Sequence, residues 1–144
     1  MDDLFGSLYI TGDKEAGSSQ GESEKSDGSS PILARVQDTK PRHLDGGRTV
    51  LRPSLPYGNT SHMMSCFLGL YIGAKYAPAP SLPGCVCHAT VISGTVSLTA
   101  EGQTFHLLER DAVRFKADQP YHFGNISSGT GRLLLEYQYL QRHT

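Results

Sequence analysis

Polar and apolar residues alternate with a period of two along much of the chain after residue 30. Thr95–Ala100 alternates strictly, as a half-buried strand does. The segment 132–140 places every second side chain, apolar or aromatic, on one face of a strand. These side chains are Leu133, Leu135, Tyr137 and Tyr139. Shorter apolar runs predict four more strands, over residues 63–72, 85–92, 104–108 and 112–115.

Turn residues separate these runs, and no 3.6-residue periodicity lasts long enough to predict a helix. The chain has 8 prolines and 16 glycines. Glu101-Gly102 lies between two predicted strands at hairpin spacing, and Ser93-Gly94 marks another bend. Many short strands with turn residues between them indicate a sandwich or a barrel. The sequence therefore predicts an all-β fold.

The first thirty residues have a different composition. Residues 17–30 read GSSQGESEKSDGSS, which offers too little apolar surface to offset the entropy of ordering. Residues 1–30 carry a net charge of −5, whereas residues 31–144 carry +4. We expect residues 1–30 to form a disordered, acidic, Gly/Ser-rich tail or linker, and residues 31–144 to form the barrel.

Composition narrows the class of protein. The net charge of the 144-residue chain is −1, which argues against a dedicated nucleic-acid binder. Three cysteines without a signal peptide favour a reducing, cytoplasmic location. No run approaches the ~18 apolar residues of a membrane helix, so we expect no membrane association.

Basic residues cluster in the segment that precedes the first predicted strand. They are Arg35, Lys40, Arg42, Arg48 and Arg52. Asp38 and Asp45 interrupt the cluster, and no aromatic residues alternate with it. This pattern favours a solvated edge that contacts a neighbouring subunit over a nucleic-acid surface.

From about Ala77 to Leu140 the order of features resembles the cupin family. The segment CVCHATVISGTVSLTAEGQTFHLLERDAVRFKADQPYHFGN looks like the two-part cupin signature. Gly94 ends the first motif, Asp111 opens the second, and 120–125 closes it. With residues 33–59 included, the chain is most similar to the C-terminal cupin domain of bacterial regulators that join a helix-turn-helix to a cupin. The resemblance implies a double-stranded β-helix, or jelly-roll, barrel.

The chain departs from that family at the metal-binding positions. The two paired histidine positions fall on or near Ser81 and Pro83, the glutamate position on Cys87, and the last histidine position on Tyr121. Loss of these ligands leaves no competitive site for iron, manganese or zinc. We therefore expect no metal, no cofactor and no catalytic residue carried over from the family. Arg110 also occupies a position where this family commonly has a turn glycine. The family's turn geometry is therefore not a safe expectation at this position.

Cys85-Val86-Cys87-His88 is the most conspicuous cluster of reactive side chains. On a strand the two thiols share one face and His88 takes the other. A zinc site would therefore need a bulge and a fourth ligand, such as Cys66 or His122. The pattern favours buried, inert cysteines that pack as small hydrophobic groups.

Four residues form the predicted ligand-binding set: Cys87, His88, Tyr121 and His122. Tyr121 should point into the barrel, where it either holds a small organic ligand or plugs the cavity that a metal would occupy. His122 and His88 should face outward, although a bulge before Gly94 would turn His88 inward.

The leading functional hypothesis is a ligand-sensing and dimerising cupin domain of the transcription-regulator type. It would lack its own DNA-binding domain, act as a homodimer and bind a small molecule. The alternative is a small cupin enzyme, an isomerase, epimerase or dioxygenase-like protein, with His88 and Tyr121 as acid and base. A third possibility is a structural barrel with a filled interior.

Overall fold

The computed structural model of the chain describes residues 31–55 and 63–139. In these ranges the chain forms ten strands and two single 3-10 turns. The elements are η4 (Val36–Asp38), β1 (Arg42–Leu44), η5 (Asp45–Gly47), β2 (Thr49–Pro53), β3 (Met63–Leu70), β4 (Lys75–Tyr76), β5 (Cys85–Ser93), β6 (Val96–Ala100), β7 (Gln103–Leu107), β8 (Ala112–Lys116), β9 (Tyr121–Asn125) and β10 (Gly131–Tyr139). No helix in these ranges is long and apolar enough to cross a membrane.

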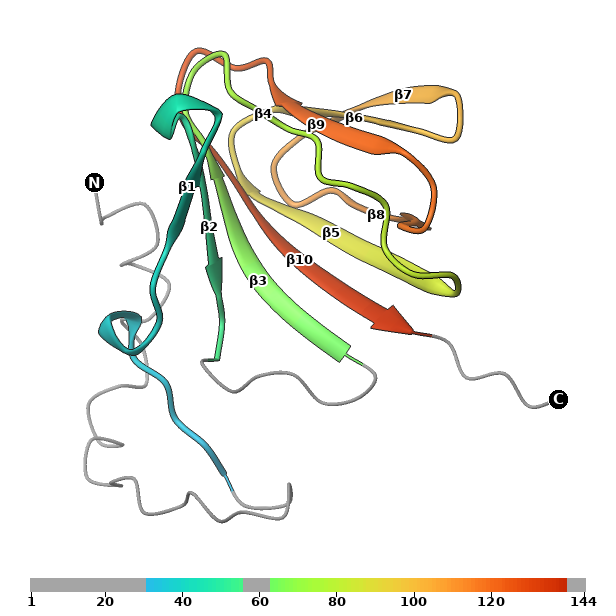
Figure 1. Cartoon of the computed structure of the whole chain (residues 1–144). Helices are drawn as coiled ribbons and strands as arrows, with labels where there is room; N and C mark the ends of the chain where they lie inside the picture. The colour runs from blue at the N-terminus through green and yellow to red at the C-terminus, as the bar shows by residue number, and fades with distance from the viewer. Residues whose placement is uncertain (1–30, 56–62, 140–144) are drawn as a thin grey trace, which may run out of the picture.

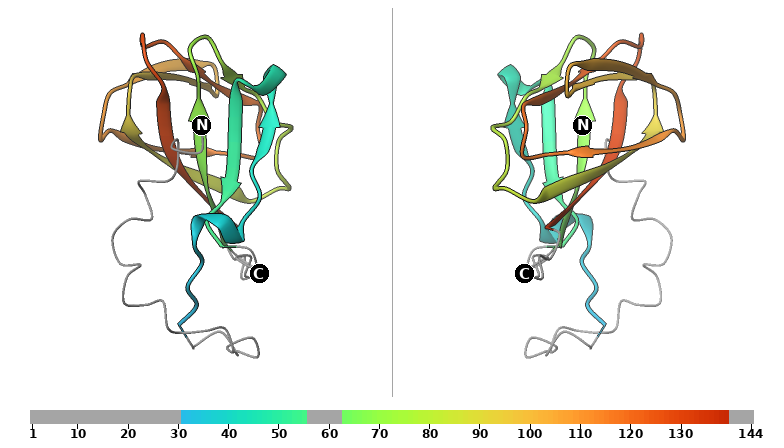
Figure 2. Two further views of the ribbon diagram at one scale, coloured as in Figure 1. Left: turned by 90° about the vertical axis from the view of Figure 1, so that its left-hand side faces the viewer. Right: turned by 90° about the vertical axis from the view of Figure 1, so that its right-hand side faces the viewer.

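The strands form two antiparallel sheets that face each other (Figure 1). Sheet A has the order β1-β2-β3-β10-β5-β8, and sheet B has the order β4-β9-β6-β7. Consecutive strands often lie in different sheets, as β5 and β6 do. Figure 2 shows both sheets curving around a common interior. The all-β, jelly-roll prediction is confirmed.

Alternation of side chains explains how the sheets close over one core. In β10 every second residue from Gly131 to Tyr137 is buried, and in β6 the pattern runs from Val96 to Ala100. The fully buried core includes Leu68, Leu98, Val91, Leu133 and Phe123. Burying such side chains contributes about 1.5–3 kcal/mol each, the main favourable term for the fold.

The six strands predicted from the sequence all exist, and their ends agree within two residues. The strands β1, β2 and β4, of three, five and two residues, were not predicted, because their sequences show no clear two-residue alternation. β9 was expected from the cupin resemblance alone. The predicted tail, residues 1–30, and Leu140 at the end of the last predicted strand lie outside the described residues.

Two turns contain residues with positive φ, and this conformation explains the glycines found there. Gly94 has φ +88°, and a Cβ atom there would lie 2.8 Å from the carbonyl oxygen of Thr130. Glu101 and Gly102, with φ 52° and 77°, form the two-residue loop of the β6–β7 hairpin. Positive φ at both positions matches the right-handed twist of the strands. The predicted hairpin is confirmed.

Arg110 lies in the turn between β7 and β8, and this turn has the backbone conformation that a glycine would adopt. Its φ is 76°, a left-handed conformation that favours glycine. Its amide donates to the Val91 carbonyl at 2.7 Å, and Asp111 accepts the Leu108 amide at 2.8 Å. The chain therefore adopts the glycine-type turn with an arginine and carries a local backbone strain.

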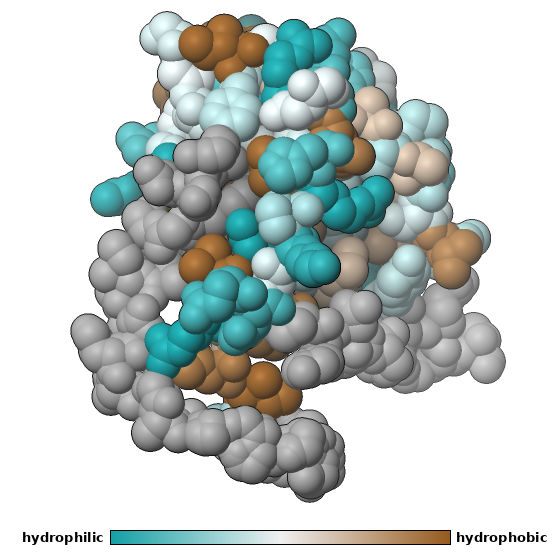
Figure 3. All heavy atoms as spheres, turned by 60° about the vertical axis from the view of Figure 1, so that its left-hand side comes forward, coloured by the Kyte–Doolittle hydropathy of each residue, from teal (hydrophilic) through white to brown (hydrophobic). Residues whose placement is uncertain are grey.

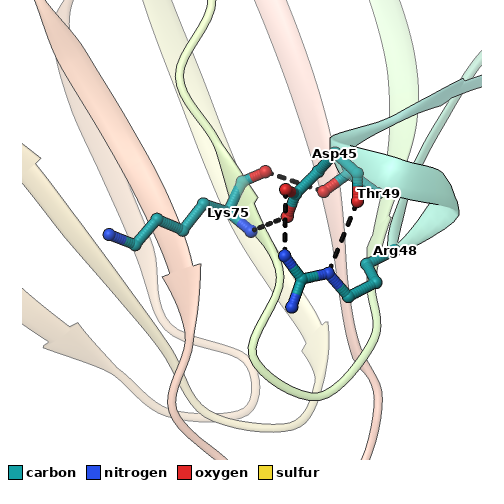
Figure 4. Close-up of polar contacts among 4 residues, drawn as sticks. All are labelled: Asp45, Arg48, Thr49 and Lys75. Atoms are coloured by element: carbon teal, nitrogen blue, oxygen red, sulfur yellow. Dashed lines mark hydrogen bonds and ion pairs between the residues drawn. The ribbon is translucent and has the colours of Figure 1, made fainter.

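A polar cluster fastens the η5 turn of sheet A to β4 of sheet B (Figure 4). Asp45 accepts the Lys75 amide at 3.1 Å, and Thr49 Oγ1 donates to the Lys75 carbonyl at 2.7 Å. Arg48 pairs with the Asp45 carboxylate at 3.1 Å. The hydrogen bond from the Lys75 amide is the main reason that the pKa of Asp45 lies below its ordinary value. The cluster joins the two sheets at this edge.

Residues 31–41, here called the entry segment, are held by one arginine. Arg52 alternates with Leu51 on β2, so it points away from the core, and it is 7% exposed. Its Nη1 donates to the carbonyls of Val36 and Thr39 at 2.8 and 2.7 Å. Hydrogen bonds to a charged donor are about twice as strong as neutral ones. The entry segment is therefore fixed to the outer side of sheet A.

Candidate functional site

A cavity of about 350 Å³ opens between the two sheets at one end of the barrel. This volume lies within the range of small-molecule sites. The lining side chains are mostly apolar or aromatic, with one cation. They are Arg42, Leu51, Met63, Met64, Cys66, Tyr76, Pro78, Ala79, Ser81, Cys85, Tyr121, Tyr137 and Tyr139.

Three tyrosines, here called the tyrosine cluster, bring their hydroxyls together in this cavity. Tyr76 comes from β4, Tyr121 from β9 and Tyr137 from β10, and they are 9, 5 and 7% exposed. The Tyr121 and Tyr137 hydroxyls lie 2.8 Å apart, and Tyr76 lines the same cavity. The Tyr121 ring packs against Phe115 at a centroid distance of 4.8 Å. Packing thus fixes the rings, while the hydroxyls face one another.

Burial keeps the tyrosine cluster protonated. It raises the pKa of Tyr76 to about 12, and desolvation also raises the pKa of Tyr121 and of Tyr137. A neutral phenol both donates and accepts a hydrogen bond. The cluster therefore offers hydrogen bonds rather than negative charge to whatever enters the cavity.

All three cysteines are free and buried, and they lie beside the tyrosine cluster. Cys66 and Cys85 line the cavity, whereas Cys87 is fully buried and lies opposite Tyr137 in the β5–β10 ladder. Burial raises the pKa of Cys66 to about 12 and that of Cys87 still further. Because the thiolate is the nucleophile and the metal ligand, these two protonated thiols are poorly suited to either role.

The structure does not bring the four predicted ligand-binding residues together. Cys87 and Tyr121 both point inward, and Tyr121 lines the cavity. His88 is exposed on the outer face of β5, between Glu136 and Arg114 on the neighbouring strands. The register shift in β5 comes after His88, opposite the Arg132–Leu133 step, so it does not turn the imidazole inward.

His122 lies half-buried on β9, and it borders a separate hollow of about 340 Å³ beside the Glu101-Gly102 hairpin. Tyr121 contributes to both hollows. His122 therefore neighbours Tyr121 in sequence without facing the barrel cavity. The ligand-binding roles of all four predicted residues stay predictions.

Sequence reasoning missed three residues of the cavity: Arg42, Tyr76 and Tyr137. The alternation in residues 132–140 had already placed Tyr137 on the inner face, but nothing in the sequence marked that position as the barrel mouth. Tyr76 lies on a two-residue strand without a periodic signal. Arg42 was grouped with the other basic residues, of which Arg48 pairs with Asp45 and Arg52 holds the entry segment.

The donor set does not fit the metal ion that a cupin resemblance suggests. Ser81 and Tyr121 line the cavity where imidazoles would be needed, and a protonated thiol stands at Cys87. No group of three or more His, Cys, Asp or Glu side chains in residues 31–55 and 63–139 could hold a metal ion. The cavity is equipped for hydrogen bonding and apolar contact with an organic molecule.

Comparison with known proteins supports the fold. No family model matches the sequence, and no curated protein does. Among solved structures, the Cupin_2 domain of an XRE-family transcriptional regulator from Enterobacter cloacae is 26% identical, with 65% of this chain and 99% of that one covered and a TM-score of 0.61.

Two more distant structures share the fold at 11% identity. The cupin domain of Schizosaccharomyces pombe Cnp3 covers 76% of this chain and 74% of its own, with a TM-score of 0.61. A predicted oxalate decarboxylase from Thermotoga maritima covers 76% and 100%, with a TM-score of 0.62. The chain thus has a cupin fold, and cupins of different functions resemble it.

Proposed function

We propose that the barrel binds a small organic molecule in its cavity and acts as a metal-free, ligand-sensing cupin domain of the transcription-regulator type. The observation that carries this proposal is the cavity of about 350 Å³ with neutral phenol hydroxyls in an otherwise mostly apolar lining. Such sites hold a ligand by apolar contact and orient it with a few polar groups. The likeness to the cupin domain of the Enterobacter cloacae regulator supports the regulatory part.

A route from the cavity to the entry segment runs through β2. Leu51 lines the cavity, and the next residue, Arg52, holds the entry segment on the opposite side of the sheet. A ligand that repositions β2 would therefore alter the anchoring of the chain that precedes the barrel. This is the coupling that a sensor domain needs.

The proposal also includes a homodimer in the cytoplasm. β7 is an edge strand, and Phe105 and Leu108 near it are 37 and 58% exposed. Unpaired edges of this kind invite pairing with a second copy. Light scattering should give twice the chain mass. The three free cysteines support a reducing compartment.

The enzyme alternative relied on His88 and Tyr121 as an acid–base pair. These residues lie in different sheets, with His88 on the outer face and Tyr121 inside the barrel. They cannot reach the same substrate in this arrangement. Stoichiometric iron, manganese, nickel or zinc in the purified protein would revive the enzyme alternative and refute the metal-free proposal.

A thermal-shift screen against metabolites tests the ligand-binding function. A ligand at 100 times its Kd adds about 2.7 kcal/mol to the free energy of unfolding, which is roughly 10 °C in Tm for a barrel of this size. Ser81→Trp places an indole in the cavity and should abolish the shift. Glu109→Trp, at an exposed turn position, is the matched control and should retain it.

Two results would refute the proposal. One is a broad screen without a single stabilising ligand, which favours a filled structural barrel. The other is a hit whose shift survives in Ser81→Trp, because the ligand would then bind elsewhere. We also expect gel shifts with the purified chain to show no sequence-selective DNA binding, since Arg48 of the basic cluster pairs with Asp45 and Arg52 holds the entry segment.

A further inference from the structure

We infer that the cavity takes a small organic anion, a carboxylate with a flat apolar body, whose charge is paired by Arg42 at the cavity mouth. The inference rests on the proposed ligand-binding function and names the chemical class of its ligand. It is built on the position of Arg42, the absence of a competing partner among the described residues, and the neutrality of the remaining lining.

Arg42 lies on the cavity side of the edge strand β1. Its partner across the ladder is Leu51, which lines the cavity, and its neighbour His43 takes the opposite face. Arg42 is exposed to solvent and also lines the cavity. The guanidinium therefore stands where a ligand's charged end would meet water and protein together.

Among residues 31–55 and 63–139, the guanidinium of Arg42 has no side-chain or backbone partner, unlike those of Arg48 and Arg52. In the described part of the chain its guanidinium makes no hydrogen bond and no ion pair, whereas Arg48 pairs with Asp45 and Arg52 holds the entry segment. Figure 3, which brings the left-hand side of Figure 1 forward, shows hydrophilic side chains over the middle of this face, with hydrophobic groups above and below them. An unpaired guanidinium beside an aromatic cavity is an available anion site, since its planar fork matches a carboxylate.

The rest of the lining accepts an anion and disfavours a cation. Arg42 is the one charged side chain among the described lining residues, so no carboxylate of the cavity competes for it. The positive charge of Arg42 acts to lower the pKa of the nearby Tyr76 phenol, although burial has the larger, opposite effect. A bound carboxylate would accept from the guanidinium and from tyrosine hydroxyls, while the side chains of Met63, Met64 and Tyr139 contact its apolar body.

Matched pairs of probes isolate the charge from the shape. Benzoate with benzamide, and 4-hydroxyphenylacetate with its amide, differ little in volume, and each fits about 350 Å³. Ligand-observed NMR titrations of the full chain should give a Kd at least about tenfold lower for each carboxylate, equivalent to about 1.4 kcal/mol. In Arg42→Met the two members of a pair should bind equally.

Two further variants distinguish a direct pair between Arg42 and the carboxylate from the effect of the overall positive charge of the barrel. Arg114→Met removes one positive charge from the exposed outer face of sheet A, and should leave the preference for carboxylates intact. Arg42→Lys keeps the charge without the fork, and should retain part of the preference. Circular dichroism of each variant checks that the barrel is folded.

The outcomes distinguish this inference from the proposed function. Amides that bind as well as carboxylates, or a preference that persists in Arg42→Met, would overturn the anion assignment and leave ligand binding standing. Failure of both members of both pairs to bind, together with an empty metabolite screen, would overturn both proposals.

Discussion

Replacing Tyr137 by phenylalanine removes one of the two hydroxyls that meet 2.8 Å apart in the barrel interior. Tyr121 and Tyr137 are 5 and 7% exposed, so the hydroxyl left on Tyr121 loses its protein partner with little access to water. A net hydrogen bond is worth about 1 kcal/mol, and an unsatisfied buried polar group costs about 1–3 kcal/mol. We expect Tyr137→Phe to lower the free energy of unfolding by about 1–3 kcal/mol, or roughly 4–12 °C in Tm.

The double variant Tyr121→Phe/Tyr137→Phe makes this test specific. It removes both partners and leaves no orphaned hydroxyl between them, so its cost should be smaller than the sum of the single costs by about 1 kcal/mol. Urea unfolding of the four proteins, followed by circular dichroism, gives the coupling energy. Additive effects, with each single variant within about 0.3 kcal/mol of the parent, would refute a buried, hydrogen-bonded hydroxyl pair.

Three further predictions test other parts of the structure. Arg110→Gly should stabilise the barrel by about 0.5–1 kcal/mol in urea unfolding, because glycine relieves the strain at φ 76°; a loss of stability would contradict the turn assignment. Thr49→Val should cost about 1–2 kcal/mol, since it leaves the Lys75 carbonyl without its 2.7 Å donor, and an unchanged urea midpoint would contradict that contact. Stability should fall as the pH rises from about 9 to about 12, because burial raises the pKa of Cys66 and of Tyr76 to about 12 while the unfolded chain loses these protons near their ordinary values of 9.0 and 10.0; urea midpoints that stay constant to pH 11 would refute that burial.

Sequence patterns predicted the fold well because a two-residue period survives even in short strands. The alternation in Thr95–Ala100 and in the 132–140 segment marks both sheets, and Glu101-Gly102 marks a hairpin. The short strands β1 and β4 escaped prediction, because pairing with β2 and β9 defines them rather than their own residues.

The candidate site was only partly predictable for a related reason. Alternation within one strand placed Cys87 and Tyr121 inward and His88 outward. Which inward residues reach the open end depends on register between strands, as with Tyr137 opposite Cys87. Arg42 reaches the cavity through the pairing of β1 with β2, which the sequence gives no means to foresee.

The central claim is that an organic ligand enters the cavity between the two sheets. Met63 and Met64 line that cavity, and the only other methionine is Met1, outside the described residues. We would record the methyl spectrum of the full chain with 13C-labelled methionine during a titration with benzoate. The account predicts saturable shifts of the Met63 and Met64 resonances. Met63 and Met64 resonances that do not move, under conditions where benzoate is shown to bind, would contradict it.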